Sequence, residues 1–153
     1  DQDIAGPYQG RGNTHEAGAR YADILQNLMR ADVAVIQREY DRACRLSYPG
    51  SVEARGHAPA ERFWIALRSA FPDARFSVDH QVGMDGNDLS PRAAIRFSLH
   101  GKHDGLGMFG RPTGAEVYVM GFAHAYFGPW GLREEIVVFD ETAIWKQILL
   151  HKG

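Results

Sequence analysis

The first part of the chain carries apolar residues with the period of a helix. From Thr14 onward, the positions that share one face are Tyr21, Ile24, Leu25 and Leu28. Asp32 can cap a second, shorter helix, whose shared face holds Val33, Ile36 and Tyr40. A third stripe follows Pro59, which is tolerated in a first helical turn, and ends at Pro72; it holds Phe63, Trp64, Leu67 and Phe71. The pattern therefore predicts three helices before residue 73.

From Arg75 onward the period changes to two, which is typical of strands with one buried face. Turns rich in Gly, Asn, Asp and Pro separate four predicted long strands, at residues 75–82, 92–100, 116–127 and 132–139. A short strand candidate, Cys44 to Tyr48, precedes the third helix, and a closing helix follows Asp140. Helices first and long strands later is the pattern of an α+β domain, with helices packed on one face of an antiparallel sheet.

The strand from Glu116 to Phe127 is apolar on both of its faces. One face packs on the helices, so the second face is also expected to be covered. In a chain this short, the expected cover is another copy of the same chain. The sequence therefore predicts a homodimer that forms through the sheet.

Composition narrows the classes of protein that remain. A length of 153 residues suits one domain, which we place at residues 14–153 after a polar, glycine-rich, flexible arm at residues 1–13. A net charge of -2 speaks against a nucleic-acid partner, and no apolar run is long enough to span a membrane. The single cysteine, Cys44, excludes an internal disulfide and a multi-cysteine zinc site. We therefore expect a cytoplasmic, soluble domain without a metal.

Short glycine-rich motifs precede the third long strand. Residues 101–105 read Gly-Lys-His-Asp-Gly, and residues 110–114 read Gly-Arg-Pro-Thr-Gly. After them come a long strand, a glycine-containing turn, Glu134, Asp140 and the pair Gln147-Ile148. In their order and spacing, these motifs resemble the SnoaL-like polyketide cyclase branch of the nuclear-transport-factor-2-like superfamily, and the resemblance extends from about Ala22 to Ile148.

The resemblance implies a cystatin-like α+β fold, in which a curved antiparallel sheet forms a cone around the N-terminal helices. It also implies dimerisation through the convex sheet face, an apolar pocket for a small apolar or aromatic ligand, and chemistry without metal or cofactor. Cyclases of this branch close a polyketide ring by intramolecular aldol chemistry, with a carboxylate on the last long strand. Relatives isomerise steroids, hydrolyse epoxides or only bind ligands, so the fold does not decide the function.

We therefore predict a small-molecule-binding domain, with cofactor-free acid–base catalysis of a cyclase, isomerase or hydrolase type as its enzymatic form. The alternative is a non-catalytic ligand-binding or interaction module of the same fold, and a third hypothesis is a partner-binding accessory domain. Residues 136–139 of the last strand contain no acid, which departs from the cyclase pattern. Only Glu134, Glu135 and Asp140 could replace it.

The candidate catalytic residues are His103, Asp140 and His124. His103 continues the alternation of Phe97 and Leu99, so we expect its side chain to reach the cavity and to bond with Tyr126, His124 or Asp140. The alternative is a core histidine or one that turns outward in the glycine-rich loop. Asp140 matches the downstream aspartate of the family, although capping the closing helix also explains it well.

The candidate ligand-binding residues are mostly aromatic. Tyr118, Phe122 and Tyr126 share a strand face with Met120 and His124, a composition that suits a small-molecule pocket. An aromatic core or a dimer interface is the alternative for this face. Three further candidates are expected around the same cavity: His80 beside Phe76 and Val78, Phe97 on the neighbouring strand, and Trp64 on the third helix.

Overall fold

The computed structural model describes residues 12–86 and 90–152, which form four helices and six strands. In chain order these are α1 (Glu16–Met29), α2 (Ala34–Glu39), β1 (Tyr40–Tyr48), β2 (Val52–Arg55), α3 (His57–Ala70), β3 (Arg75–Asp85), β4 (Pro91–Lys102), β5 (Glu116–Gly128), β6 (Gly131–Phe139) and α4 (Glu141–Lys152). The predicted α+β class and curved sheet are confirmed. The predicted second helix ends earlier than expected, because Tyr40 begins a strand, and the short strand β2 was not predicted.

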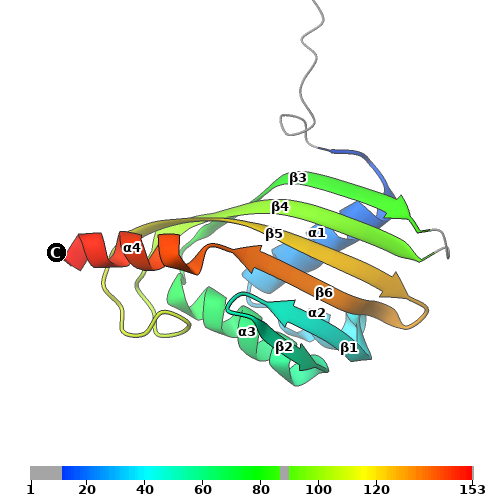
Figure 1. Cartoon of the computed structure of the whole chain (residues 1–153), viewed down its shortest axis with the longest axis horizontal. Helices are drawn as coiled ribbons and strands as arrows, with labels where there is room; N and C mark the ends of the chain where they lie inside the picture. The colour runs from blue at the N-terminus through cyan, green and yellow to red at the C-terminus, as the bar shows by residue number, and fades with distance from the viewer. Residues whose placement is uncertain (1–11, 87–89, 153) are drawn as a thin grey trace, which may run out of the picture.

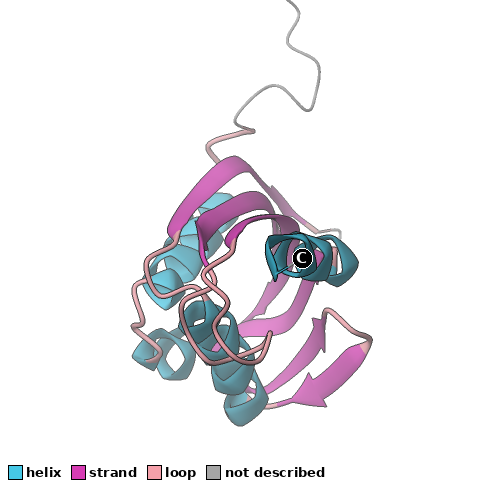
Figure 2. Ribbon diagram, turned by 90° about the vertical axis from the view of Figure 1, so that its left-hand side faces the viewer, coloured by secondary structure: helices cyan, strands magenta, loops and turns pink. Residues whose placement is uncertain are grey.

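The six strands form one sheet in the order β2-β1-β6-β5-β4-β3. All neighbouring strands are antiparallel except β1 and β6, which run parallel. This departs from the fully antiparallel sheet that we expected, and the reason is that β1 enters the sheet from the helical N-terminal part and lies beside the last strand. Figures 1 and 2 show the sheet curving over α1, α2 and α3, which lie on its concave side, with α4 at one end.

The core fills the space between this concave face and the helices. Its largest fully buried side chains are Trp64, Tyr21, Phe71, Phe97, Phe127, Ile24, Leu25, Leu28, Ile36, Leu67, Ile95 and Leu132. Gly121 lets the Phe97 ring lie close to β5, since a Cβ atom there would come within 2.5 Å of that ring. The bulky Phe97 ring of β4 is thus matched by a glycine on the neighbouring strand.

The start of the described chain is attached to the sheet edge. Gly12 forms a bridge with Gln81 on β3, and the Asn13 side chain exchanges hydrogen bonds with the backbone of Gly83, both at 3.0 Å. Gly12 and Asn13 of the expected flexible arm therefore pack against β3, and the rest of that arm lies outside the described residues.

Candidate functional site

Among the described residues, one carboxylate is buried inside the cone, at Glu135 on β6. Its side chain is fully inaccessible to solvent. Atom Oε2 accepts hydrogen bonds from the hydroxyls of Tyr21 at 2.6 Å and Tyr40 at 2.5 Å. Atom Oε1 accepts from the Tyr48 hydroxyl at 2.7 Å and from Trp64 Nε1 at 3.2 Å. We call Glu135 with these four donors the tyrosine cage.

Four separate elements bring the tyrosine cage together. Alternation along β6 turns Glu135 inward together with Val137 and Phe139. Tyr21 comes from the buried stripe of α1 and Trp64 from that of α3. Tyr40 and Tyr48 stand at the two ends of β1, an even number of residues apart and both buried, beside the strand that carries Glu135.

Burial and hydrogen bonding act on Glu135 in opposite directions. Burial raises the pKa of its carboxyl, because the charged form loses its water, and the four donors lower that pKa in part. The net pKa stays above the ordinary value for glutamate. An ionised carboxylate has about four lone-pair sites, and here each of them meets a donor. The cage therefore suits the anion geometrically, while burial favours taking up a proton.

For the three tyrosines of the cage, burial and the neighbouring charge shift the pKa in the same direction. Burial raises the pKa of Tyr21, Tyr40 and Tyr48, and the negative charge of Glu135 raises each of them further. All three hydroxyls therefore stay protonated and act as donors to the carboxylate. Tyrosinate is excluded as a base in this cage at ordinary pH.

A pocket of about 350 Å³ opens next to the cage, where β1, β2 and α3 meet the loop after β4. We call it the mouth pocket; its lining is Tyr48, Pro49, Val52, Ala54, Pro59, Arg62, Phe63, Met108 and Glu141. Tyr48 belongs to both features, because it lines the pocket and donates to Glu135. Its ring stacks on Phe63 with 4.0 Å between centroids. The pocket is thus mostly apolar, with charge only at Arg62 and Glu141.

His103 lies in the core and not with its predicted partners. Its side chain is fully buried, and its Nδ1 lies 2.9 Å from the Thr113 hydroxyl. Its backbone bonds Ala115 and Thr113, so it anchors the loop between β4 and β5. The predicted inward orientation holds, but the predicted bond to Tyr126, His124 or Asp140 is wrong. The cause is local, because the loop folds back and places Thr113 beside the ring.

Asp140 lies at the start of α4, where it acts as a helix cap. Its side chain is exposed, and its Oδ1 accepts a hydrogen bond from the Ala143 amide at 3.1 Å. This is the capping role that the sequence offered as the alternative. The structure does not bring Asp140 to the tyrosine cage.

The aromatic face of β5 points outward. The predicted sharing of one face is correct, but Tyr118 and Phe122 are each about half exposed, His124 is exposed, and Tyr126 is partly covered. In the middle of β5 the inward positions are the small residues Gly121, Ala123 and Ala125, and Val117, Val119 and Phe127 are buried nearer its two ends. The Phe97 ring of β4 already lies against Gly121, so a large inward side chain does not fit at that position. The expected place of this face inside the cone is wrong, and His124 and Tyr126 instead line a separate pocket of about 240 Å³ together with Val82, Met84, Arg92, Ala93, Ala94 and Ala125.

The remaining candidates divide between the outer face and the core. A bulge in β3 pairs Val78 with Phe97 but His80 with Arg96, so it turns His80 to the outer face, opposite to the expected orientation. Phe97 and Trp64 are buried in the core, and Trp64 alone of the predicted ligand-binding residues belongs to the tyrosine cage. Sequence reasoning did not find the cage itself, although the parity of Glu135 with Val137 and Phe139 was its signal.

Comparison with known proteins adds information on the fold. No family model and no curated protein matches this chain. The chain is similar in structure to AclR, a putative hydroxylase from Streptomyces galilaeus, at a TM-score of 0.70 and 21% identity, covering 88% of this chain and 82% of that one. A putative SnoaL-like polyketide cyclase from Jannaschia sp. CCS1 matches at 0.70 and 16% identity, over 89% and 96% of the two chains. The chain has the SnoaL-like fold.

A third neighbour supports this assignment of the fold. IdmH, a putative polyketide cyclase from Streptomyces antibioticus, matches at a TM-score of 0.69 and 16% identity, over 88% of this chain and 99% of its own. The resemblance to the SnoaL-like fold that the sequence motifs indicated is therefore confirmed in three dimensions. At these identities the likeness concerns the SnoaL-like fold alone.

Proposed function

We propose that this SnoaL-like chain binds a small apolar or aromatic molecule in the mouth pocket and performs acid–base chemistry on it through Tyr48 and Glu135. The observation that carries the proposal is the double position of Tyr48, in the lining of the pocket and in the cage. The apolar lining suits an apolar or aromatic body, as in most small-molecule sites. The neighbours named as putative polyketide cyclases support this class of ligand.

The chemistry is a proton transfer in two linked steps. A bound carbon acid gives its proton to the Tyr48 oxygen while Tyr48 passes its own proton to Oε1 of Glu135. Both tyrosine and glutamate are then neutral, and the ligand carries the negative charge as an enolate. The raised pKa of Glu135 favours this uptake. Return of the proton at another atom of the ligand completes an isomerisation, and attack of the enolate on a carbonyl completes a ring closure.

The second candidate is a non-catalytic ligand-binding module, and one observation favours it. Glu135 is enclosed and already accepts four hydrogen bonds, which stabilise the anion and weaken it as a base. In that case Tyr48 and Phe63 form only a stacked aromatic wall of the mouth pocket. The two candidates share the ligand and its location and differ in turnover.

Occupancy of the mouth pocket can be tested with the neutral fluorescent probe N-phenyl-1-naphthylamine. We expect saturable binding, and we expect Val52→Trp to weaken it about tenfold or more, because the indole fills the pocket from its rim. Ile65→Trp is the matched control, since Ile65 is an exposed β-branched residue on α3 outside the pocket lining. Equal affinity in the Val52→Trp variant would show that the probe binds elsewhere.

We also propose a homodimer that forms through the outer face of the sheet. Tyr118, Met120, Phe122 and Val138 are each about half exposed on this face. An exposed apolar patch of this kind on a globular domain marks an interaction surface.

Phe122→Glu is expected to convert a micromolar solution of the dimer to monomer, because each subunit would bring a charge into the apolar interface. Sedimentation velocity measures the change. Ile65→Glu, which places the same charge on an exposed position of α3, should leave the dimer intact. A monomeric unchanged protein would refute the proposal.

The remaining expectations concern cofactor, nucleic acid and location. In the described part of the chain, no group of three His, Cys, Asp or Glu side chains is placed to hold a metal ion. None of the described helices is long and apolar enough to cross a membrane. The lack of a cofactor, the lack of a nucleic-acid partner and a cytoplasmic location stay proposals from the composition.

A further inference from the structure

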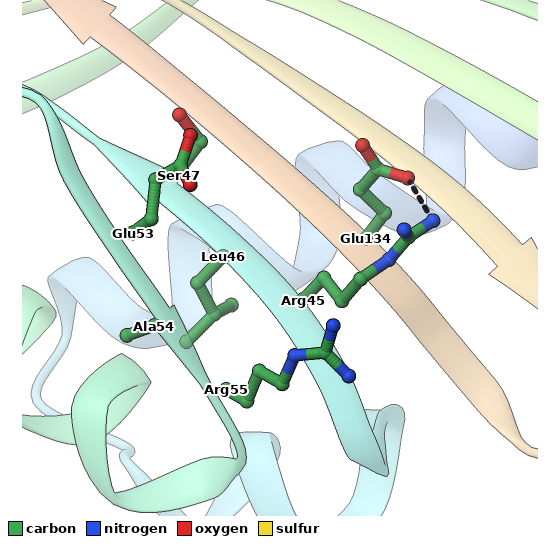
Figure 3. Close-up of a pocket in the computed structure, with 7 residues that line it drawn as sticks. All are labelled: Arg45, Leu46, Ser47, Glu53, Ala54, Arg55 and Glu134. Carbon is green, nitrogen blue, oxygen red and sulfur yellow. Dashed lines mark hydrogen bonds and ion pairs between the residues drawn. The ribbon is translucent and has the colours of Figure 1, made fainter.

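A polar groove lies on the outer face of the sheet where β1, β2 and β6 meet. Its volume is about 370 Å³, and its lining is Arg45, Leu46, Ser47, Glu53, Ala54, Arg55 and Glu134 (Figure 3). Ala54 also lines the mouth pocket, but β2 separates the two features: Val52 is on the mouth-pocket side, and Glu53 and Arg55 are in the groove. The groove therefore stands apart from the tyrosine cage and its pocket.

Two arginines stand directly opposite each other in this groove. Arg45 on β1 is the cross-strand partner of Arg55 on β2, and Figure 3 shows both side chains extending toward the same end of the groove. Like charges at directly opposite positions of a strand pair destabilise the pair. A sheet that keeps this arrangement at a groove gains stability when an anion lies between the two guanidinium groups.

The two guanidinium groups are held differently. Arg45 lies 3.1 Å from Glu134, which fixes its position across the β1–β6 pair. Within residues 12–86 and 90–152, no hydrogen bond or ion pair joins the Arg55 side chain to another residue. The Arg55 guanidinium is thus available to a ligand, and Arg45 offers a second guanidinium whose orientation is set by Glu134. Two planar guanidinium groups match the several oxygens of a phosphate or carboxylate.

We propose that this groove binds the phosphate or carboxylate group of a small polar molecule, held between Arg45 and Arg55. Ser47 and Glu53, which are opposite each other farther along the same two strands, supply a hydroxyl and a carboxylate for hydroxyl groups of that molecule. The ligand is polar throughout, in contrast to the apolar ligand of the mouth pocket. It binds at millimolar or sub-millimolar concentration, since both arginines are largely exposed to water.

The test is a titration followed at the arginine Nε–H signals by nuclear magnetic resonance, at constant ionic strength. Inorganic phosphate and succinate are the two probes, and they separate a phosphate-bearing ligand from a carboxylate-bearing one. We expect saturable shifts of the Arg45 and Arg55 signals with at least one of them. Arg55→Gln should weaken that binding about tenfold, as expected for loss of a charge-assisted contact. Arg111→Gln, an exposed arginine in the loop after β4, is the matched control and should change nothing.

A gain of affinity gives an independent check. Glu134→Gln frees Arg45 from its carboxylate partner, so anion binding should tighten about threefold. Shifts that stay linear up to high concentration, or equal affinity in the Arg55→Gln variant, overturn the proposal. Because the groove is separate from the mouth pocket, neither anion should displace N-phenyl-1-naphthylamine, and failure here leaves the proposed function untouched.

Discussion

Replacement of Glu135 by leucine is expected to lower the free energy of unfolding by about 4 kcal/mol, because buried donors lose their charged acceptor. The three tyrosine hydroxyls and the Trp64 indole all donate to this carboxylate, and the residues that carry them are buried, with Tyr48 at the edge of the mouth pocket. Glu135→Gln keeps one acceptor oxygen but turns an amide group toward two donors, so we expect a loss of about 3 kcal/mol. Urea unfolding followed by circular dichroism measures both.

The neighbouring glutamate provides the control. Glu134 lies on the outer face in an exposed ion pair with Arg45, and Glu134→Gln should change stability by less than about 1 kcal/mol. If Glu135→Leu does not fold, Tyr48→Phe tests the same cage more mildly, with an expected loss of about 1 to 2 kcal/mol from one missing hydrogen bond. A Glu135→Gln protein as stable as the unchanged one would contradict the cage as described.

Stability is also expected to fall steeply above pH 10. The pKa values of Tyr21, Tyr40 and Tyr48 are raised in the folded state, so these groups keep their protons there while the unfolded chain loses them. The stability that they contribute is therefore fully present below pH 10 and is lost as the pH rises beyond it. Each tyrosine adds about 1.4 kcal/mol per pH unit, or about 4 kcal/mol per unit for the three.

Urea unfolding between pH 9 and 11.5 measures this slope. Tyr40→Phe should reduce it by about a third, because one of three linked protons is removed. Tyr126→Phe, which removes a tyrosine outside both the cage and the proposed dimer patch, is the matched control. A Tyr40→Phe slope equal to that of the unchanged protein would mean that Tyr40 ionises as freely in the folded chain as in the unfolded one.

The sequence pattern was sufficient for all elements but the short strand β2, and for which residues share a face along β4, β5 and β6. It could not decide which face of β5 enters the cone, because both faces are apolar and the deciding factor is the volume that other segments already occupy, as the Phe97 ring does beside Gly121. Ala123 and Ala125 point inward and Phe122 points outward because of packing between segments that are distant in the sequence. The hydrophobic pattern also could not predict the orientation of His80, because one extra residue in β3 reverses the alternation of faces.

The tyrosine cage shows the same limit more clearly. Tyr21 and Glu135 are 114 residues apart in sequence, and nothing local to either predicts their contact. The alternation along the last long strand does place Glu135 on the same face as Val137 and Phe139, and an acid on an apolar face is the sequence feature that indicates the cage. His103 and Asp140 drew attention through a motif, and the structure gives both of them local roles, in a loop and in a helix cap.

The claim that Tyr48 and Glu135 move a proton is tested most directly by hydrogen–deuterium exchange at the α-carbon of 2-tetralone, a bicyclic apolar ketone, in the presence of the protein. We predict exchange about 10²-fold faster than in buffer alone, which is the lower range for general acid–base catalysis. Tyr48→Phe should return the rate to that of buffer, while N-phenyl-1-naphthylamine still binds with an affinity within about twofold of the unchanged protein. If 2-tetralone displaces the probe but its α-protons exchange no faster than in buffer, or if Tyr48→Phe exchanges as fast as the unchanged protein, the proton transfer proposed here does not occur.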